Sequence, residues 1–160
     1  MRPPFFIPFC MDLWQLQRNV KEIDAWDILI PIIEKNIHHV ERLNKEQLQQ
    51  GIRSTGARLP SHSRSQKSEI YVDSKIARGV YDQSIYPSWN LYNTGSFYNK
   101  IKAEIELSYG ISIESFDYKA QGLEDAIGSD MYGLTNESLN QFCALLIDEF
   151  QTNLLKAMSK

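Results

Sequence analysis

Three histidines are the first side chains to consider for catalysis or metal binding. His38 and His39 are adjacent, so on a helix their side chains would point about 100° apart and could not share an ion in the i,i+4 manner. His62 lies in a serine-rich stretch that runs from Ser61 to Ser68. The spacing of the histidines therefore indicates no metal site.

A nucleophilic mechanism requires Ser, Cys or Thr beside a base that a third group orients. The sequence has no Gly-x-Ser-x-Gly motif and no phosphate-binding glycine motif. The carboxylate pair Glu104 and Glu106 occupies alternate positions of a predicted strand, which is typical of a solvated strand face. We therefore predict that the protein is not an enzyme and has no catalytic, cofactor-binding or metal-binding residues.

The chain has two cysteines, Cys10 and Cys143, which lie far apart in the sequence. Two cysteines are too few for a disulfide framework, and no Cys-x-x-Cys motif indicates a metal or redox site. Cys143 falls within an apolar helical pattern, so we expect it on the packed face of that helix.

Aromatic residues cluster between positions 81 and 98, and they fit either the core of a small domain or a surface that contacts a partner. The candidates for an interface are four aromatic residues of this cluster and three phenylalanines near the N-terminus: Tyr81, Tyr86, Trp89, Tyr92, Phe5, Phe6 and Phe9. Lysine and arginine residues are concentrated between positions 53 and 78. This stretch is either a solvated loop or a surface that faces DNA or an acidic partner. The candidates for that surface are Arg53, Arg58 and Arg64.

A length of 160 residues predicts a single domain with an arm, and the formal net charge of −3 lacks the basic excess of a dedicated nucleic-acid binder. No apolar run is long enough to span a bilayer, so we expect no contact with a membrane. Residues 1–11 contain three prolines and are expected to form an extended arm that docks on its own domain or on a neighbour. Residues 12–160 form the predicted domain, and Met11 is a second candidate for the start of the protein.

The apolar spacing predicts a short helix over 12–21, a long helix that begins at Asp24 or Asp27 and ends at Gly51, and a last helix from Thr135 to Met158. We expect the apolar face of each long helix to be buried, namely Trp26, Leu29, Ile30, Ile33, Ile37, Val40 and Leu48 in the first and Leu139, Phe142, Cys143, Leu146, Ile147, Phe150 and Leu154 in the last. Asn93 or Thr94 should cap a short helix that carries Phe97, Tyr98 and Ile101. A hairpin of strands 103–108 and 111–118 follows. Residues 51–90 and 119–131 are interpreted as loops and connections. The predicted fold class is α+β, with long N-terminal and C-terminal helices packed on a small antiparallel sheet.

The order of these features resembles the small tail-completion, neck (head–tail connector) and minor tail proteins of tailed bacteriophages, especially those of Bacteroidetes phages. The resemblance covers roughly residues 45–155 and rests on short motifs after the first long helix: Gly51, the segment Leu91-Tyr-Asn-Thr94-Gly95 with Phe97, and Tyr132-Gly133-Leu-Thr135. In this family the Thr-Gly element is a folding signature, in which threonine caps a helix and glycine permits a turn. The Phe- and Pro-rich first ten residues depart from the family pattern.

The resemblance implies a structural subunit of a ring, of six or twelve copies, at the head–tail junction or upper tail of the virion. Its partners would be copies of itself, the portal or adaptor and the tail proteins, and DNA would pass nearby without sequence-specific binding. Such a protein would be made in the cytoplasm of the bacterial host. Two alternatives are a phage assembly adaptor or chaperone that leaves the finished virion, and a small nucleic-acid-binding protein that uses the basic stretch.

Overall fold

The computed structural model describes residues 23–62, 65–106 and 110–159. The predicted arm with Phe5, Phe6 and Phe9, the helix expected over 12–21, and Arg64 lie outside the described residues.

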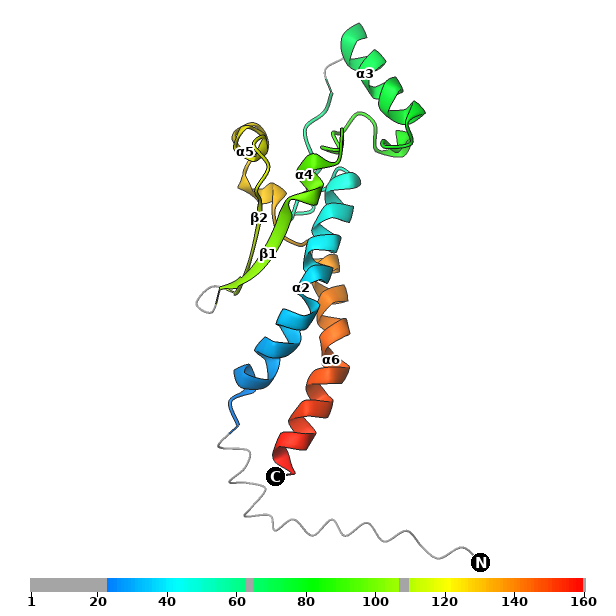
Figure 1. Cartoon of the computed structure of the whole chain (residues 1–160). Coiled ribbons are helices and arrows are strands. Elements are labelled where there is room, and N and C mark those ends of the chain that lie inside the picture. Colours follow the sequence, from blue (N-terminus) through cyan, green and yellow to red (C-terminus); the bar gives the residue numbers. More distant parts are fainter. Residues whose placement is uncertain (1–22, 63–64, 107–109, 160) are drawn as a thin grey trace, which may run out of the picture.

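Two long antiparallel helices form the body of the molecule. Helix α2 (Ala25–Gln49) and helix α6 (Asn136–Met158) lie side by side, and a two-stranded antiparallel sheet packs against α2 (Figure 1). Strand β1 (Ile101–Glu106) pairs with strand β2 (Gly110–Ser115), with Ile101 opposite Ser115 and Ala103 opposite Ile113. The shorter helices α3 (Gln66–Ala77), α4 (Ser96–Asn99) and α5 (Ala120–Ile127) lie toward the end of the molecule where α2 ends. The fold is α+β, as predicted.

Local capping sets both ends of α2. The Asp24 side chain accepts a hydrogen bond from the Trp26 N–H at 2.9 Å, so Asp24 rather than Asp27 is the N-cap, and Pro31 lies inside the helix. At the other end the Ile52 and Gly51 N–H groups donate to the carbonyls of Gln47 and Leu48, which is a Schellman motif. Gly51 has the left-handed φ of 71° that this motif requires.

The segment between Leu91 and the hairpin differs in detail from the prediction. The N-cap of α4 is Gly95, with a left-handed φ of 83°, and not Asn93 or Thr94. The helix is only one turn long, because Ile101 already begins β1. Both strands therefore start earlier than predicted, and the second strand ends earlier, at Ser115. Phe116 and Tyr118, predicted within the second strand, follow it and are exposed.

Two stretches that were predicted to lack regular structure contain helices. Helix α3 lies within the basic region, and helix α5 with a following 3-10 turn (Ser129–Met131) lies within residues 119–131. Both are short, and α3 has a weak apolar pattern, with Val72 and Lys75 as its buried residues. Helix α5 has an apolar stripe of Ala120, Leu123 and Ile127 that packs in the main core, but at eight residues it is too short to be stable without that packing.

Candidate functional site

A groove of about 630 Å³ runs between α2, α6 and β2, and every residue that lines it is apolar. Ile111 and Ile113 come from β2, and Leu134 precedes α6. The two long helices supply most of the remaining lining: Trp26, Leu29, Ile33, Val40, Leu139, Phe142, Cys143, Leu146, Ile147 and Phe150. A groove of this size without a charged side chain is suited to bind another apolar chain segment.

The apolar face of α6 is only partly covered. Phe142 and Leu146 are buried against α2 and the sheet, as predicted. Leu139 and Ile147 are about half exposed, at 47% and 49%, and Cys143 is exposed, so the expectation that all these residues pack inside is wrong. The apolar stripe of α6 is wider than the surface that α2 and the sheet offer to it.

Trp26 extends the exposed apolar surface to the first turn of α2. Its side chain is 61% exposed, although its helical spacing predicted a buried position. Lys35 of α2 and Glu149 of α6 form an ion pair between the two long helices, with Nζ 2.9 Å from Oε1. This pair is exposed, so it contributes little to stability, but its position shows how close the two helices run.

Hydrogen bonds from α2 to the Gly133-Leu-Thr135 motif hold the start of α6 against the end of α2. The buried side chains of Asn44 and Gln47 both donate to the Gly133 carbonyl, at 2.8 and 2.7 Å. Gln47 Oε1 also accepts from the Thr135 N–H at 2.9 Å, and Thr135 caps α6 through the Ser138 N–H. Gly133 is required here because an added Cβ would lie 3.0 Å from Ser54 Cβ. This contact gives the Gly133-Leu-Thr135 motif a structural role at the start of α6.

The Leu91–Phe97 motif also has a structural role. Phe97 is buried in the core with Tyr98 and Ile101, and Leu91 packs against that core. Gly95 lies over the Tyr92 ring, where a Cβ would be 3.0 Å from the hydroxyl oxygen. Thr94 Oγ1 accepts a long hydrogen bond of 3.4 Å from the Ser96 N–H.

The structure separates the four predicted interface aromatics of the 81–92 region. Tyr81 is buried, and its hydroxyl donates to the Ser88 carbonyl at 2.6 Å, so it belongs to the core. Trp89 and Tyr92 are partly buried against the main core. Tyr86, which precedes a cis peptide bond to Pro87, is 44% exposed and remains available to a partner.

Two of the predicted DNA-facing arginines have intramolecular contacts. Arg53 Nη1 donates to the Ile127 carbonyl at 3.1 Å and lies 3.3 Å from Asp130 Oδ1, so it joins two segments of the fold. Arg58 is exposed, and its Nη1 is 3.3 Å from the Gln50 carbonyl oxygen. Both side chains therefore have partners within the fold.

Sequence reasoning missed the most unusual charged residue, Lys75 of α3. Lys75 is 2% exposed, and burial lowers its pKa to about 8, with a further contribution from the charge of Arg78. Burial and the charge of Lys75 also lower the pKa of the nearby His62. The signal in the sequence is the spacing of Val72, Lys75 and Ile76, which places the lysine among the inward-facing residues of a helix.

Further features of the described residues narrow the choice of sites. In residues 23–62, 65–106 and 110–159, no three His, Cys, Asp or Glu side chains are grouped as a metal site requires. No helix in these ranges has the length and apolar character needed to cross a membrane.

Comparison with protein-family models, curated proteins and solved structures gives no match for this chain.

Proposed function

We propose that the chain is a non-enzymatic structural subunit of a ring at the head–tail junction or upper tail of a tailed-phage particle. The observation that supports it is the uncharged groove between α2, α6 and β2, with Leu139, Cys143 and Ile147 exposed along it. An open apolar face of this kind is typical of a surface that contacts another molecule, and an apolar segment of a neighbouring chain suits it. The phage assignment itself rests on the motif resemblance.

The proposed occupant of the groove is the N-terminal arm of a neighbouring copy. Residues 3–11 contain no charged side chain and include Phe5, Phe6, Ile7 and Phe9, which match the chemistry of the groove. Burying apolar side chains contributes roughly 25 cal/mol per Å², whereas burying an unpaired charge is costly. An uncharged arm and an uncharged groove are therefore complementary.

The length of the arm suits an exchange between subunits. The chain enters the described domain at Ile23, one turn before Trp26, which lines the groove. The extended arm of residues 1–11 can span about 35 Å and the helix predicted over 12–21 adds about 15 Å, which together suffice to reach the groove of an adjacent copy. An arm of one subunit in the groove of the next is a heterologous contact, and contacts of this type close rings.

The two cysteines of the chain provide a direct test, because Cys10 lies in the arm and Cys143 lines the groove. Mild oxidation should produce disulfide-linked oligomers on a non-reducing gel, and Cys10→Ser or Cys143→Ser should each abolish them. Negative-stain images of the unoxidised protein should show closed rings. A disulfide within one chain, or a protein that stays monomeric at high concentration, would refute arm exchange and the ring.

A charged substitution in the groove separates assembly from folding. Ile147→Glu places a carboxylate in the groove at a half-exposed position, so the domain should fold while the rings dissociate. The matched control is Gln151→Glu, one turn later on α6 at an exposed position outside the groove lining. Circular dichroism would verify folding, and sedimentation velocity would measure assembly.

A further inference from the structure

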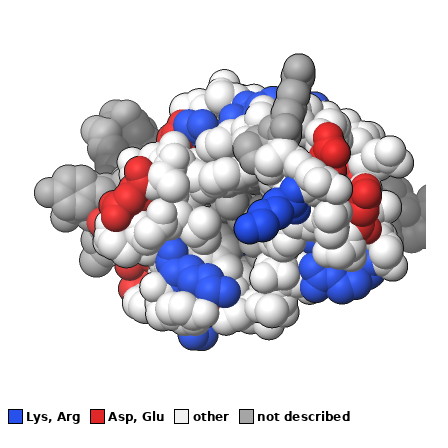
Figure 2. All heavy atoms as spheres, turned by 90° about the horizontal axis from the view of Figure 1, so that it is seen from above, with Lys and Arg blue, Asp and Glu red and all other residues white. Residues whose placement is uncertain are grey.

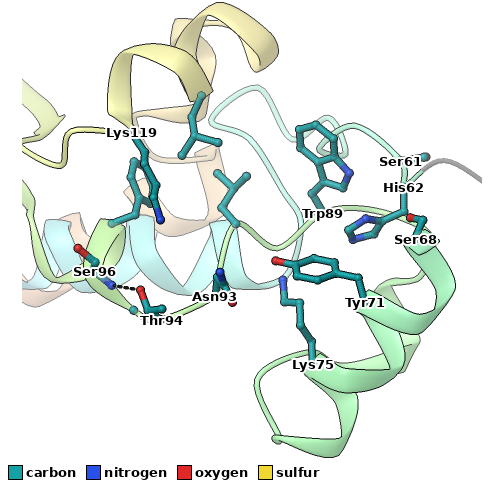
Figure 3. Close-up of a pocket in the computed structure, with 14 residues that line it drawn as sticks. Ser61, His62, Ser68, Tyr71, Lys75, Trp89, Asn93, Thr94, Ser96 and Lys119 are labelled. Carbon is teal, nitrogen blue, oxygen red and sulfur yellow. Dashed lines mark hydrogen bonds between the residues drawn. The ribbon is translucent and has the colours of Figure 1, made fainter.

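A second pocket, of about 610 Å³, lies between α3, the segment from Trp89 to Phe97 and the start of α5. Its polar lining consists of hydrogen-bond donors and basic groups, including His62, Ser68, Asn93 and Lys119, together with Lys75 (Figure 3). The described residues that line it include no aspartate or glutamate. Figure 2 looks onto this end of the molecule, where basic side chains border a central hollow and acidic ones lie nearer the edge.

Lys75 is a buried cation without a carboxylate partner. Its Nζ donates to Asn90 Oδ1 and lies 5.4 and 5.3 Å from the ring centroids of Tyr71 and Tyr81. Within the described residues, no Asp or Glu forms an ion pair with it. A neutral amide and two aromatic rings stabilise an ammonium only in part, so the charge remains available to an anion.

The surrounding backbone fixes Lys75 in this position. Asn90 is buried, its Oδ1 also accepts from the Tyr92 N–H, and its Nδ2 donates to the Val80 carbonyl at 2.6 Å. The next residue, Leu91, has a left-handed φ of 52° and lines the pocket. A non-glycine residue in this conformation is strained, and such residues are enriched at binding sites.

A second basic group in the pocket has an unused hydrogen-bonding atom. His62 Nε2 is buried and has no hydrogen-bond partner within the described part of the chain. The His62 ring lies close to Tyr71, Tyr81 and Trp89, with centroid distances of 5.9 to 6.1 Å. The site thus combines a cation, an imidazole nitrogen and flat aromatic surfaces.

We propose that this pocket binds a small planar organic monocarboxylate, whose charge Lys75 neutralises and whose ring packs against Tyr71 and Trp89. One carboxylate balances the charge of Lys75, which is the buried ammonium among the described residues of the lining. The apolar lining of Trp89, Leu91 and Leu123 is suited to the uncharged part of such a molecule. This inference is independent of the ring proposed above.

Benzoate is the probe, with benzamide as its uncharged analogue and inorganic phosphate as a second anion. Titration of the full-length ¹⁵N-labelled protein should shift amide signals around residues 62–75 and 89–97 with benzoate only. Because burial lowers the pKa of Lys75 to about 8, the affinity for benzoate should fall as the pH rises above that value. Neither Ile147→Glu nor loss of rings should change this binding.

Three variants complete the test. Lys75→Met should weaken benzoate binding roughly tenfold or more, because a charge-assisted contact is lost. Asn93→Glu, at an exposed lining position in contact with Arg78, adds a negative charge to the pocket without disturbing the core and should also weaken benzoate binding. Lys67→Met removes the same charge from an exposed position of α3 and should have no effect.

Each alternative outcome contradicts the proposal. Equal binding of benzamide would show that Lys75 is not the counter-ion. Binding of phosphate in place of benzoate would contradict the assignment of the ligand as a monocarboxylate. Absence of binding by all three probes, or full benzoate affinity in the Lys75→Met and Asn93→Glu variants, would refute the site.

Discussion

The buried ammonium of Lys75 should make the stability of this protein depend on pH in a predictable direction. Burial lowers the pKa of Lys75 from 10.5 to about 8 in the folded state. Between these values the folded protein has released the Lys75 proton, whereas the unfolded chain still binds it. The free energy of unfolding should therefore rise with pH across this range.

The magnitude follows from the two pKa values. A shift from 10.5 to about 8 corresponds to roughly 3 kcal/mol of destabilisation while the amine is charged in both states. Between pH 7 and pH 9.5, about 2 kcal/mol of this should be recovered, since the unfolded lysine is still mostly protonated at pH 9.5. Measurement should stop there, because burial also raises the pKa of Tyr132 to about 12 and tyrosines begin to ionise in the unfolded chain near pH 10.

The assay compares the wild-type protein with the Lys75→Met variant by urea unfolding at several pH values. Methionine removes the charge and also the hydrogen bond to Asn90, but the loss of that bond does not depend on pH. The stability difference between the two proteins should therefore change by about 2 kcal/mol from pH 7 to 9.5, in favour of the wild type. Lys67→Met, on the exposed side of α3, should show no such change. A difference that stays constant with pH would refute the reasoning.

Two further predictions concern the end of α2 and the start of α6. Gly51→Ala should cost more stability than Gly56→Ala, although both glycines have a left-handed φ. A Cβ at Gly51 would lie 2.9 Å from the Trp89 carbonyl oxygen, whereas a Cβ at Gly56 meets nothing within 4 Å. Equal losses of stability in urea unfolding would show that the left-handed conformation alone matters. Thr135→Ala should cost about 1 kcal/mol, because it removes the side-chain cap of α6, whereas Thr135→Ser should cost less. An unchanged midpoint of thermal unfolding in Thr135→Ala would contradict this role.

The long elements were predictable because their signals are repeated over many residues. Helices α2 and α6 have regular apolar spacing, and Thr135 is a strong cap, so their existence and most of their bounds follow from the sequence. The alternation of β1 likewise places Ala103 inside and Glu104 outside. Helix α3 was missed because its stabilising contacts come from residues distant in the sequence, such as Asn90 for Lys75, and α5 was missed because its apolar positions span only eight residues. Local patterns do not contain that information.

The candidate sites were only partly predictable, for a related reason. Helical spacing identifies the apolar residues of α6, but it does not tell which of them a neighbouring element covers. Leu146 is 7% exposed and Ile147, the next residue, is 49% exposed, although both are large and aliphatic. The second pocket depends on α3, a helix that the sequence did not indicate, so its components appeared as unrelated residues of a polar loop.

The groove and the Lys75 pocket both depart from what folding stability alone would favour, but in opposite ways. At the exposed positions Leu139 and Ile147, polar side chains would make the domain more soluble at little cost to its core. At the buried position of Lys75, a methionine or leucine would avoid the cost of a charge without a counter-ion. Local choices that oppose both solubility and stability are expected where a surface serves another molecule. The direction of each departure then indicates what that molecule supplies, an apolar segment in the groove and a negative charge in the pocket.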